Sequence, residues 1–185
     1  MGRLRRVAGI APDYLRTAWW GLVEAPAAPR PLRVVQAVIL DARGVLLSVR
    51  RDLRGWELPG GNPAPGEDEP EALAREVREE TGLEVRVERL AGEYHRSGFL
   101  PHVARVFRCA AVGGILTPSD ETPRLGWFDP ESPPRTLFPW YRGPLRDALG
   151  PAGPPVVRHE HQGLAAVWAG LRIDLAMRWS DDAAV

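Results

Sequence analysis

Three glutamates in this sequence have a spacing that suits a metal ion. Glu76, Glu79 and Glu80 stand at positions i, i+3 and i+4, which share one face of an α-helix. Carboxylates this close repel one another and weaken the helix unless a cation neutralises them. Mg²⁺ takes carboxylate oxygens and keeps waters and substrate phosphates as its other ligands. The spacing therefore indicates either a divalent-metal site or a solvated acidic helix face, and the solvated face is the commoner arrangement.

The helix that carries these glutamates is predicted to run from about Glu69 to Thr81. Asp68 can act as its N-cap with Glu71 three residues later, which is a capping-box arrangement. Pro70 falls in the first turn, where its missing N–H costs no hydrogen bond. Gly82 follows the last turn, where a left-handed residue commonly ends a helix.

The order of residues from Gly61 to Leu83, GNPAPGEDEPEALAREVREETGL, resembles the signature of the Nudix hydrolases at every defined position. The preceding segment Trp56–Gly60, WELPG, is similar to the usual lead-in of that family. A weaker resemblance, in strand order and in a later GG…ET…WF segment, extends from about Arg33 to Leu149.

The resemblance implies an α/β (α+β) fold, in which an α/β/α sandwich surrounds a mixed β-sheet. It implies an Mg²⁺-dependent or Mn²⁺-dependent hydrolase of nucleoside diphosphate derivatives. The implied metal ligands are Glu76, Glu79, Glu80 and the main-chain carbonyl of Gly60. Glu76 or Glu121 would take the proton of the attacking water, and Glu121 is alternatively an exposed loop acid. Arg75 is also expected among the catalytic residues. The resemblance implies that Glu67 orients the side of the helix that carries Arg75.

Candidate substrate contacts lie outside the acidic helix. Arg50 and Arg51 end a predicted strand beside the motif, where a guanidinium matches phosphate oxygens, although solvated strand ends also carry arginine. The connection predicted over His95–His102 contains Arg96 and Phe99 and suits a substrate-side loop. Phe99 either stacks on a base or covers the edge of the core.

The composition excludes some partners. The 24 basic residues, all arginine, balance 24 acidic ones, so net charge predicts neither nucleic-acid nor membrane binding. Pro12, Asp13 and Arg16 interrupt the N-terminal apolar stretch, which argues against a secretory signal. One cysteine, Cys109, excludes an internal disulfide and fits a reducing cytoplasm, where we expect a small-molecule nucleotide substrate.

The chain divides into three predicted parts. Residues 1–31 form a helix over Pro12–Glu24 and a proline-rich linker, 32–150 form the hydrolase domain, and 151–185 form a helical extension. The extension should contain an amphipathic helix over His161–Trp179. It would pack on the N-terminal helix or form a homodimer contact.

The favoured substrate is ADP-ribose or a nucleotide sugar, followed by an oxidised nucleoside triphosphate. The alternative is a non-catalytic domain that senses a nucleotide and regulates a partner. That alternative usually accompanies a degraded acidic motif, whereas every motif carboxylate is present in this sequence.

Overall fold

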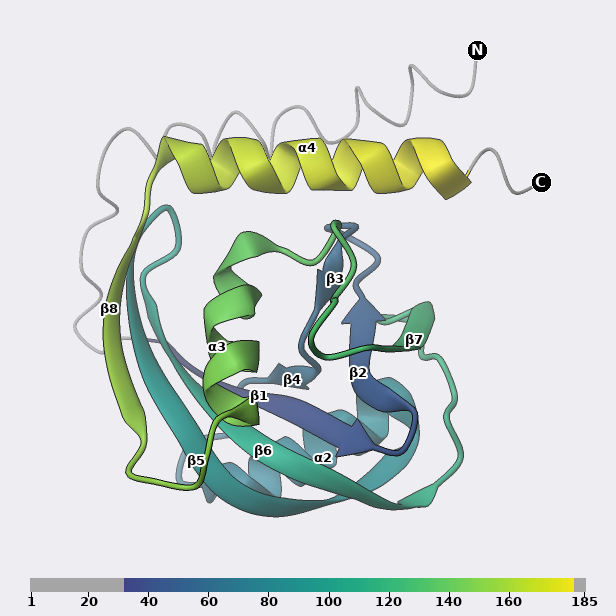
Figure 1. The fold of residues 1–185 in the computed structure, drawn as a ribbon, viewed down its shortest axis with the longest axis vertical. Coiled ribbons are helices and arrows are strands. Elements are labelled where there is room, and N and C mark those ends of the chain that lie inside the picture. The colour runs from purple at the N-terminus through teal and green to yellow at the C-terminus, as the bar shows by residue number, and fades with distance from the viewer. Residues whose placement is uncertain (1–31, 182–185) are drawn as a thin grey trace.

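A mixed β-sheet forms the centre of the fold. The computed structural model describes residues 32–181, and the sheet order is β3-β2-β1-β6-β5-β8, with β4 paired to β1 and β7 paired to β2 (Figure 1). Strand β1 is parallel to β6, and β5 is parallel to β8, while the other pairings are antiparallel. The strands are β1 Leu32–Asp41, β2 Gly44–Val49, β3 Trp56–Glu57, β4 Gly60–Gly61, β5 Leu83–Gly98, β6 His102–Gly114, β7 Arg124–Phe128 and β8 Val156–Gln162.

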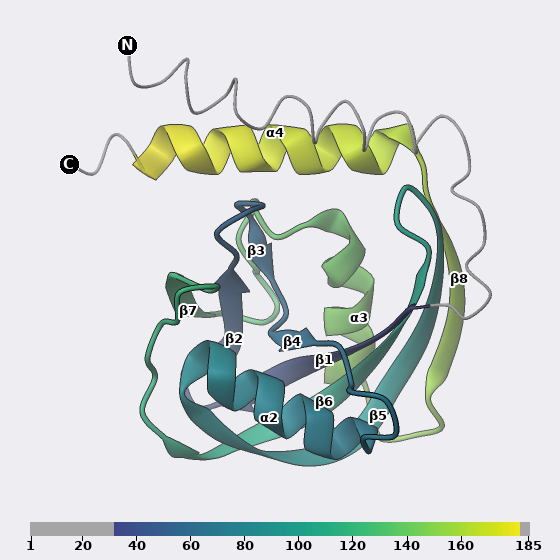
Figure 2. The ribbon, with the colours of Figure 1, turned by 180° about the vertical axis from the view of Figure 1, so that it is seen from behind.

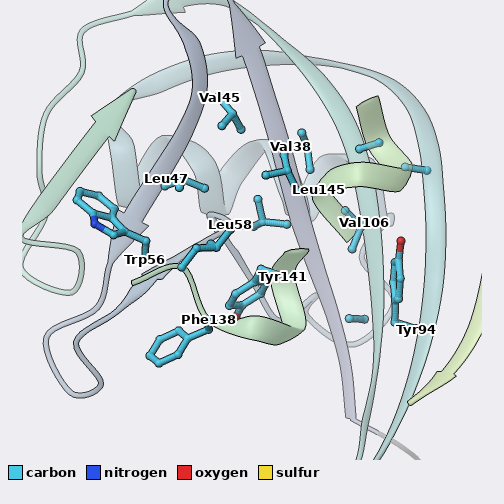
Figure 3. Packing of buried hydrophobic residues seen from close by; sticks show 14 of the residues in the cluster. Val38, Val45, Leu47, Trp56, Leu58, Tyr94, Val106, Phe138, Tyr141 and Leu145 are labelled. Atoms are coloured by element: carbon cyan, nitrogen blue, oxygen red, sulfur yellow. The ribbon is translucent and has the colours of Figure 1, made fainter. Parts of the chain in front are cut away.

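Helices cover both faces of the sheet, as an α/β/α sandwich requires. Helix α2 (Glu69–Thr81) packs on the face that carries Val35 and Ile39 of β1 (Figure 2). Helix α3 (Pro139–Leu149) packs on the other face, where Val38 of β1 and Leu145 of α3 belong to one core (Figure 3). The alternation along β1 follows from the two-residue period of a strand.

The acidic helix matches its predicted bounds, and its apolar side explains its position. Leu73 and Val77 are fully buried against β1, so the opposite side is left for the carboxylates. Gly82 ends the helix with φ 72°, as predicted. The predicted capping box is wrong, because Asp68 is the N-cap residue but its side chain makes no cap hydrogen bond.

The prediction of a connection over His95–His102 needs correction. Strand β5 continues to Gly98, so His95 and Arg96 lie in a strand and the loop before β6 is only three residues long. Arg96 is consequently held by strand pairing to β6 and β8 and does not lie in a loop.

The C-terminal extension contains a strand that the sequence analysis did not predict. Residues Val156–Gln162 pair with β5 as β8, and helix α4 (Leu164–Asp181) starts three residues after the predicted His161. Only part of the predicted apolar stripe is buried, because Val167 is buried while Trp168 is 62% exposed. The N-terminal helix and linker predictions lie outside the described residues.

The single cysteine lies in the core. Cys109 is fully buried, and burial raises its pKa to about 12. Within residues 32–181, no helix combines the length and the apolar character that crossing a bilayer would need.

Candidate active site

The predicted carboxylates line one cavity at the C-terminal half of α2. Its volume is about 230 Å³, and six residues surround it: Glu76, Glu79, Glu80, Ser119, Asp120 and Glu121. Three of these residues come from the helix and three from the loop between β6 and β7. The structure therefore brings Glu121 to the helix glutamates, and it adds Asp120, which the sequence analysis left out of the site.

Arg75 keeps the carboxylates together. Its guanidinium donates to both carboxylate oxygens of Glu67, each at 2.9 Å. The same group donates to Glu76 at 3.0 Å and to Glu79 at 3.3 Å. The bonds from Arg75 to Glu67 lower the pKa of Glu67 to about 2, since they stabilise the charged form of this carboxylate. The expected orienting role of Glu67 thus has a direct geometric basis.

Glu80 is the most buried of the three helix glutamates. Its residue is 8% exposed, and one carboxylate oxygen accepts the N–H of Gly60 at 3.0 Å. Burial raises the Glu80 pKa to about 7, and the nearby Glu76 and Glu121 charges act in the same direction. The Gly60 N–H and the Arg50 charge oppose this rise. A buried carboxylate with two acidic neighbours is the site at which a cation relieves most repulsion.

The loop that carries Glu121 is held by contacts on three adjacent residues. Thr122 is fully buried, and its hydroxyl donates to the main-chain oxygen of Glu80 at 2.5 Å. The main-chain N–H of Arg51 donates to the Glu121 carbonyl at 2.9 Å. The side chains of Arg51 and Asp120 form an exposed ion pair at 3.2 Å. Contacts between segments far apart in the sequence therefore set the position of Glu121.

The donor set fits a hard divalent cation. Only carboxylates and a hydroxyl line the cavity, and oxygen donors are those that Mg²⁺ and Mn²⁺ prefer. Among residues 32–181, no three acidic, histidine or cysteine side chains already converge on one point as ligands. Arg75 donates to one oxygen each of Glu76 and Glu79, and the Gly60 N–H donates to one oxygen of Glu80. The second oxygen of each carboxylate lies outside these bonds and is left to bind an ion.

Two glycines lie next to the carboxylates because side chains would not fit there. Gly60 has φ 150°, and a Cβ there would lie 2.1 Å from the Val35 carbonyl oxygen. At Gly61, a Cβ would lie 2.3 Å from the Glu76 carboxyl group. The first clash involves backbone, whereas the second can be relieved by moving the end of a side chain.

We expect Gly61→Ala to displace the Glu76 carboxylate while leaving the fold intact. The Mg²⁺ concentration for half-maximal activity should rise about tenfold, the lower range for losing support of a metal ligand. Metal titrations of activity measure this change, with Gly153→Ala as the control because nothing lies within 4 Å of a Cβ there. Equal metal dependence in both variants would contradict the assignment of Glu76 as a ligand.

A second, larger cavity of about 370 Å³ is lined by Gly60 and Gly61, which also lie next to Glu80 and Glu76 of the acidic cavity. Aromatic rings form part of its wall: Phe138 and Trp140 stack with centroids 4.8 Å apart, and Phe99 meets Trp140 edge-on at 6.2 Å. The volume lies in the range of pockets that take small organic ligands. Phe99 therefore belongs to a cavity wall.

The three predicted arginines have different surroundings. Arg50 lines the larger cavity and forms a two-bond pair with Asp52, both at 3.0 Å. Arg51 is exposed and lies beside Asp120 of the acidic cavity. Arg96 also lines the larger cavity, but its side chain is 1% exposed and already bonded to protein groups. Arg50 and Arg51 are thus better placed than Arg96 to meet an incoming phosphate.

The sequence analysis missed a hydrogen-bonded chain on the cavity wall. Gln36 donates to the Tyr141 hydroxyl at 3.3 Å, and that hydroxyl donates to Glu57 at 3.2 Å. Burial raises the Glu57 pKa to about 8, against an opposing effect of Arg50. All three residues line the larger cavity. The sequence signal for this hydrogen-bonded chain was Gln36, a polar residue within the apolar run of a predicted strand.

Comparison with known proteins shows the family of this chain. A family model described as the NUDIX domain matches residues 30–148. A MutT-like protein of Streptomyces ambofaciens is 38% identical over 142 residues, which are 76% of this chain and 92% of that protein. A putative 8-oxo-dGTP diphosphatase of Bacillus subtilis strain 168 is 31% identical over 141 residues, which are 76% and 91% of the two chains.

Solved structures show the same fold. A NUDIX hydrolase from Nitrosomonas europaea has a TM-score of 0.63 to this chain at 22% identity, covering 73% of this chain and 81% of that one. Together with the family model, these matches define the protein as a hydrolase of the Nudix class. The chain belongs to the Nudix family, which confirms the resemblance drawn from the motif. Within this family, the protein is a pyrophosphohydrolase.

Proposed function

We propose that this Nudix pyrophosphohydrolase cleaves a phosphoanhydride bond in a nucleoside diphosphate derivative at the junction of the two cavities. The observation that carries the proposal is that Gly60 and Gly61 line the larger cavity and also lie next to Glu80 and Glu76 of the acidic cavity. A cavity lined by carboxylates suits the cation-bound diphosphate, and the aromatic cavity suits the nucleoside. The regulatory alternative has less support, because Glu76, Glu79 and Glu80 are all present and line one cavity.

Glu76, Glu79, Glu80 and the Gly60 carbonyl would hold the divalent cation. Such a cation neutralises diphosphate oxygens and makes bound water a stronger nucleophile. Arg75 acts as a positioning residue, since its bonds hold Glu67, Glu76 and Glu79 together.

The remaining groups have roles in moving charge. Glu121, exposed at the rim of the acidic cavity, would take the proton when water adds to phosphorus. The bond from phosphorus to the bridging oxygen breaks, and the leaving phosphate carries the displaced electron pair. Arg50 or Arg51 would stabilise that negative charge. The products are a nucleoside monophosphate and a second phosphate compound.

The candidate substrates can be ranked. The aromatic cavity supports a nucleoside, and the Bacillus subtilis relative is named for an oxidised guanine nucleotide. We therefore propose an oxidised deoxynucleoside triphosphate as the first substrate to test, with ADP-ribose and a nucleotide sugar as the next. This order reverses the preference drawn from the sequence.

A substrate panel tests the proposal. Purified protein is incubated with Mg²⁺ and 8-oxo-dGTP, dGTP, ADP-ribose or UDP-glucose, and products are identified by mass. Reaction in ¹⁸O-labelled water shows which phosphorus is attacked. We expect a nucleoside monophosphate from at least one compound, and none when EDTA replaces Mg²⁺. Binding of these nucleotides without hydrolysis of any of them would support the sensing alternative.

A further inference from the structure

The C-terminal extension lies beyond the family-matched residues, yet it contacts the nucleoside-side cavity. The family model ends at residue 148, and β8 and α4 follow it. Strand β8 extends the sheet beside β5, and α4 runs across the end of the molecule near α3 (Figures 1 and 2). Gln162, the last residue of β8, lines the larger cavity and is 5% exposed.

One wall of that cavity is held by an ion pair from β8. Glu160 accepts a hydrogen bond from Arg96 Nε at 3.1 Å. The Arg96 Nη2 in turn donates to the main-chain oxygen of Trp140 at 2.7 Å, and Nη1 lies 3.3 Å from His102 Nε2. A buried guanidinium requires such partners, because an unpaired buried charge is costly. Glu160 therefore fixes Arg96, and Arg96 fixes the start of the helix that carries Trp140.

Helix α4 holds another part of the wall. Asp174 is fully buried and accepts the main-chain N–H of Arg54 at 2.7 Å and Arg178 Nε at 2.7 Å. Arg178 also donates to the main-chain oxygen of Asp52 at 3.0 Å. Asp52 is the partner of Arg50, and both residues line the cavity. The loop after β2 is thus tied to α4 at two points.

The backbone of α4 also lies against the aromatic wall. A Cβ at Gly170 would lie 3.2 Å from the Trp140 ring, so the absence of a side chain there lets helix and ring approach closely. Trp140 is consequently held on one side by α4, on another by Phe138, and through its carbonyl by Arg96. A ring fixed in this way loses little entropy when a ligand stacks beside it.

We propose that β8 and α4 position the wall of the cavity that binds the nucleoside half of the substrate, with Glu160 and Asp174 as positioning residues and Gln162 as a direct contact. The inference rests on the proposed function and adds to it the part of the chain that supports the nucleoside cavity. Neither Glu160 nor Gln162 lines the acidic cavity, so changes at these two positions should act on the nucleoside half.

Binding experiments separate the two halves. Titration calorimetry with Mg²⁺ measures the Kd of 8-oxo-dGMP, AMP and inorganic pyrophosphate for the full chain. In Glu160→Gln, the Kd of the nucleotide that the wild type binds should rise about tenfold, while the Kd of pyrophosphate stays within about twofold. Gln162→Ala removes a wall of the cavity without touching an ion pair, and its nucleotide Kd should rise in the same selective way.

Glu88→Gln is the matched control. Glu88 also lies on a strand and accepts an arginine Nε, that of Arg108, at 3.1 Å, but it does not line the cavity. Its Kd values should equal those of the wild type. Thermal unfolding of each variant identifies any loss of folded protein, and Gln162→Ala serves as the test if Glu160→Gln does not fold.

Each outcome decides the inference separately from the proposed function. Selective loss of nucleotide binding supports it even if the substrate panel finds no hydrolysis. Equal loss of nucleotide and pyrophosphate binding would overturn the inference. Unchanged nucleotide binding in Glu160→Gln and Gln162→Ala would also overturn it, and neither result would contradict the proposed hydrolysis. Failure of the wild type to bind either nucleotide would also overturn it.

Discussion

Glu80→Gln should reduce turnover by roughly 10²–10³-fold without unfolding the protein. The amide oxygen can still accept the Gly60 N–H that Glu80 accepts at 3.0 Å, so the local structure keeps its hydrogen bond. The negative charge is lost, however, from the most buried of the three helix glutamates. A neutral amide binds a hard cation much more weakly than a carboxylate does.

Steady-state kinetics on the best substrate of the panel, at saturating Mg²⁺, measures the effect. Glu71→Gln is the control, because it removes a carboxylate from an exposed position in the first turn of the same helix. Circular dichroism of both variants should match the wild type. Retention of wild-type turnover by Glu80→Gln would remove the carboxylate cavity from the mechanism.

The second large effect concerns stability and pH. The pKa of Glu57 is about 8 in the folded protein, mainly because of burial, against 4.5 as its ordinary value. Below pH 4.5 the group is protonated whether the chain is folded or unfolded. As the pH rises from 4.5 to 8, the unfolded chain releases this proton while the folded protein keeps it. The stabilisation present at low pH is therefore lost progressively, and the loss is complete above pH 8.

Glu57→Gln should abolish this dependence, since the amide oxygen can still accept from Tyr141 and carries no charge. The full pKa difference would correspond to several kcal/mol, but Glu57 is partly exposed in the cavity wall, and contact with solvent lowers the cost of its charge. We therefore expect the variant to gain about 2 kcal/mol over the wild type between pH 4.5 and 8.5.

Urea unfolding in EDTA at several pH values measures the gain, and EDTA keeps bound metal from altering the charge balance. Glu71→Gln is again the control, because it removes an exposed carboxylate. A constant difference between Glu57→Gln and the wild type across this range would show that Glu57 titrates normally.

The acidic helix shows how much of the site could be predicted. The spacing of Glu76, Glu79 and Glu80, and the apolar Leu73 and Val77, are local features, and the helix has its predicted bounds. The missing Asp68 cap bond is a local prediction that failed, because a favourable residue type at the N-cap does not oblige its side chain to bond. Family resemblance extended the prediction to the fold.

Strand β8 shows where prediction failed. Its sequence VVRHEHQ has no alternation of apolar and polar residues, and six of its seven residues, Val156 to His161, are exposed or partly exposed. Its pairing with β5 is a contact between segments more than 60 residues apart, which no local pattern encodes. Arg96 was misplaced in a loop for the same reason, since β6 and β8 hold the end of β5 in the sheet.

The sequence by itself determined the chemistry of this protein: which side chains are acidic, that they share a helix face, and that the helix ends at Gly82. Those properties depend on residue type and on a period of 3.6 residues, and both are local. Only the tertiary structure decided what surrounds them. The loop bearing Asp120 and Glu121, the aromatic cavity and the C-terminal wall are brought together by contacts between distant segments, whose energies depend on packing in three dimensions.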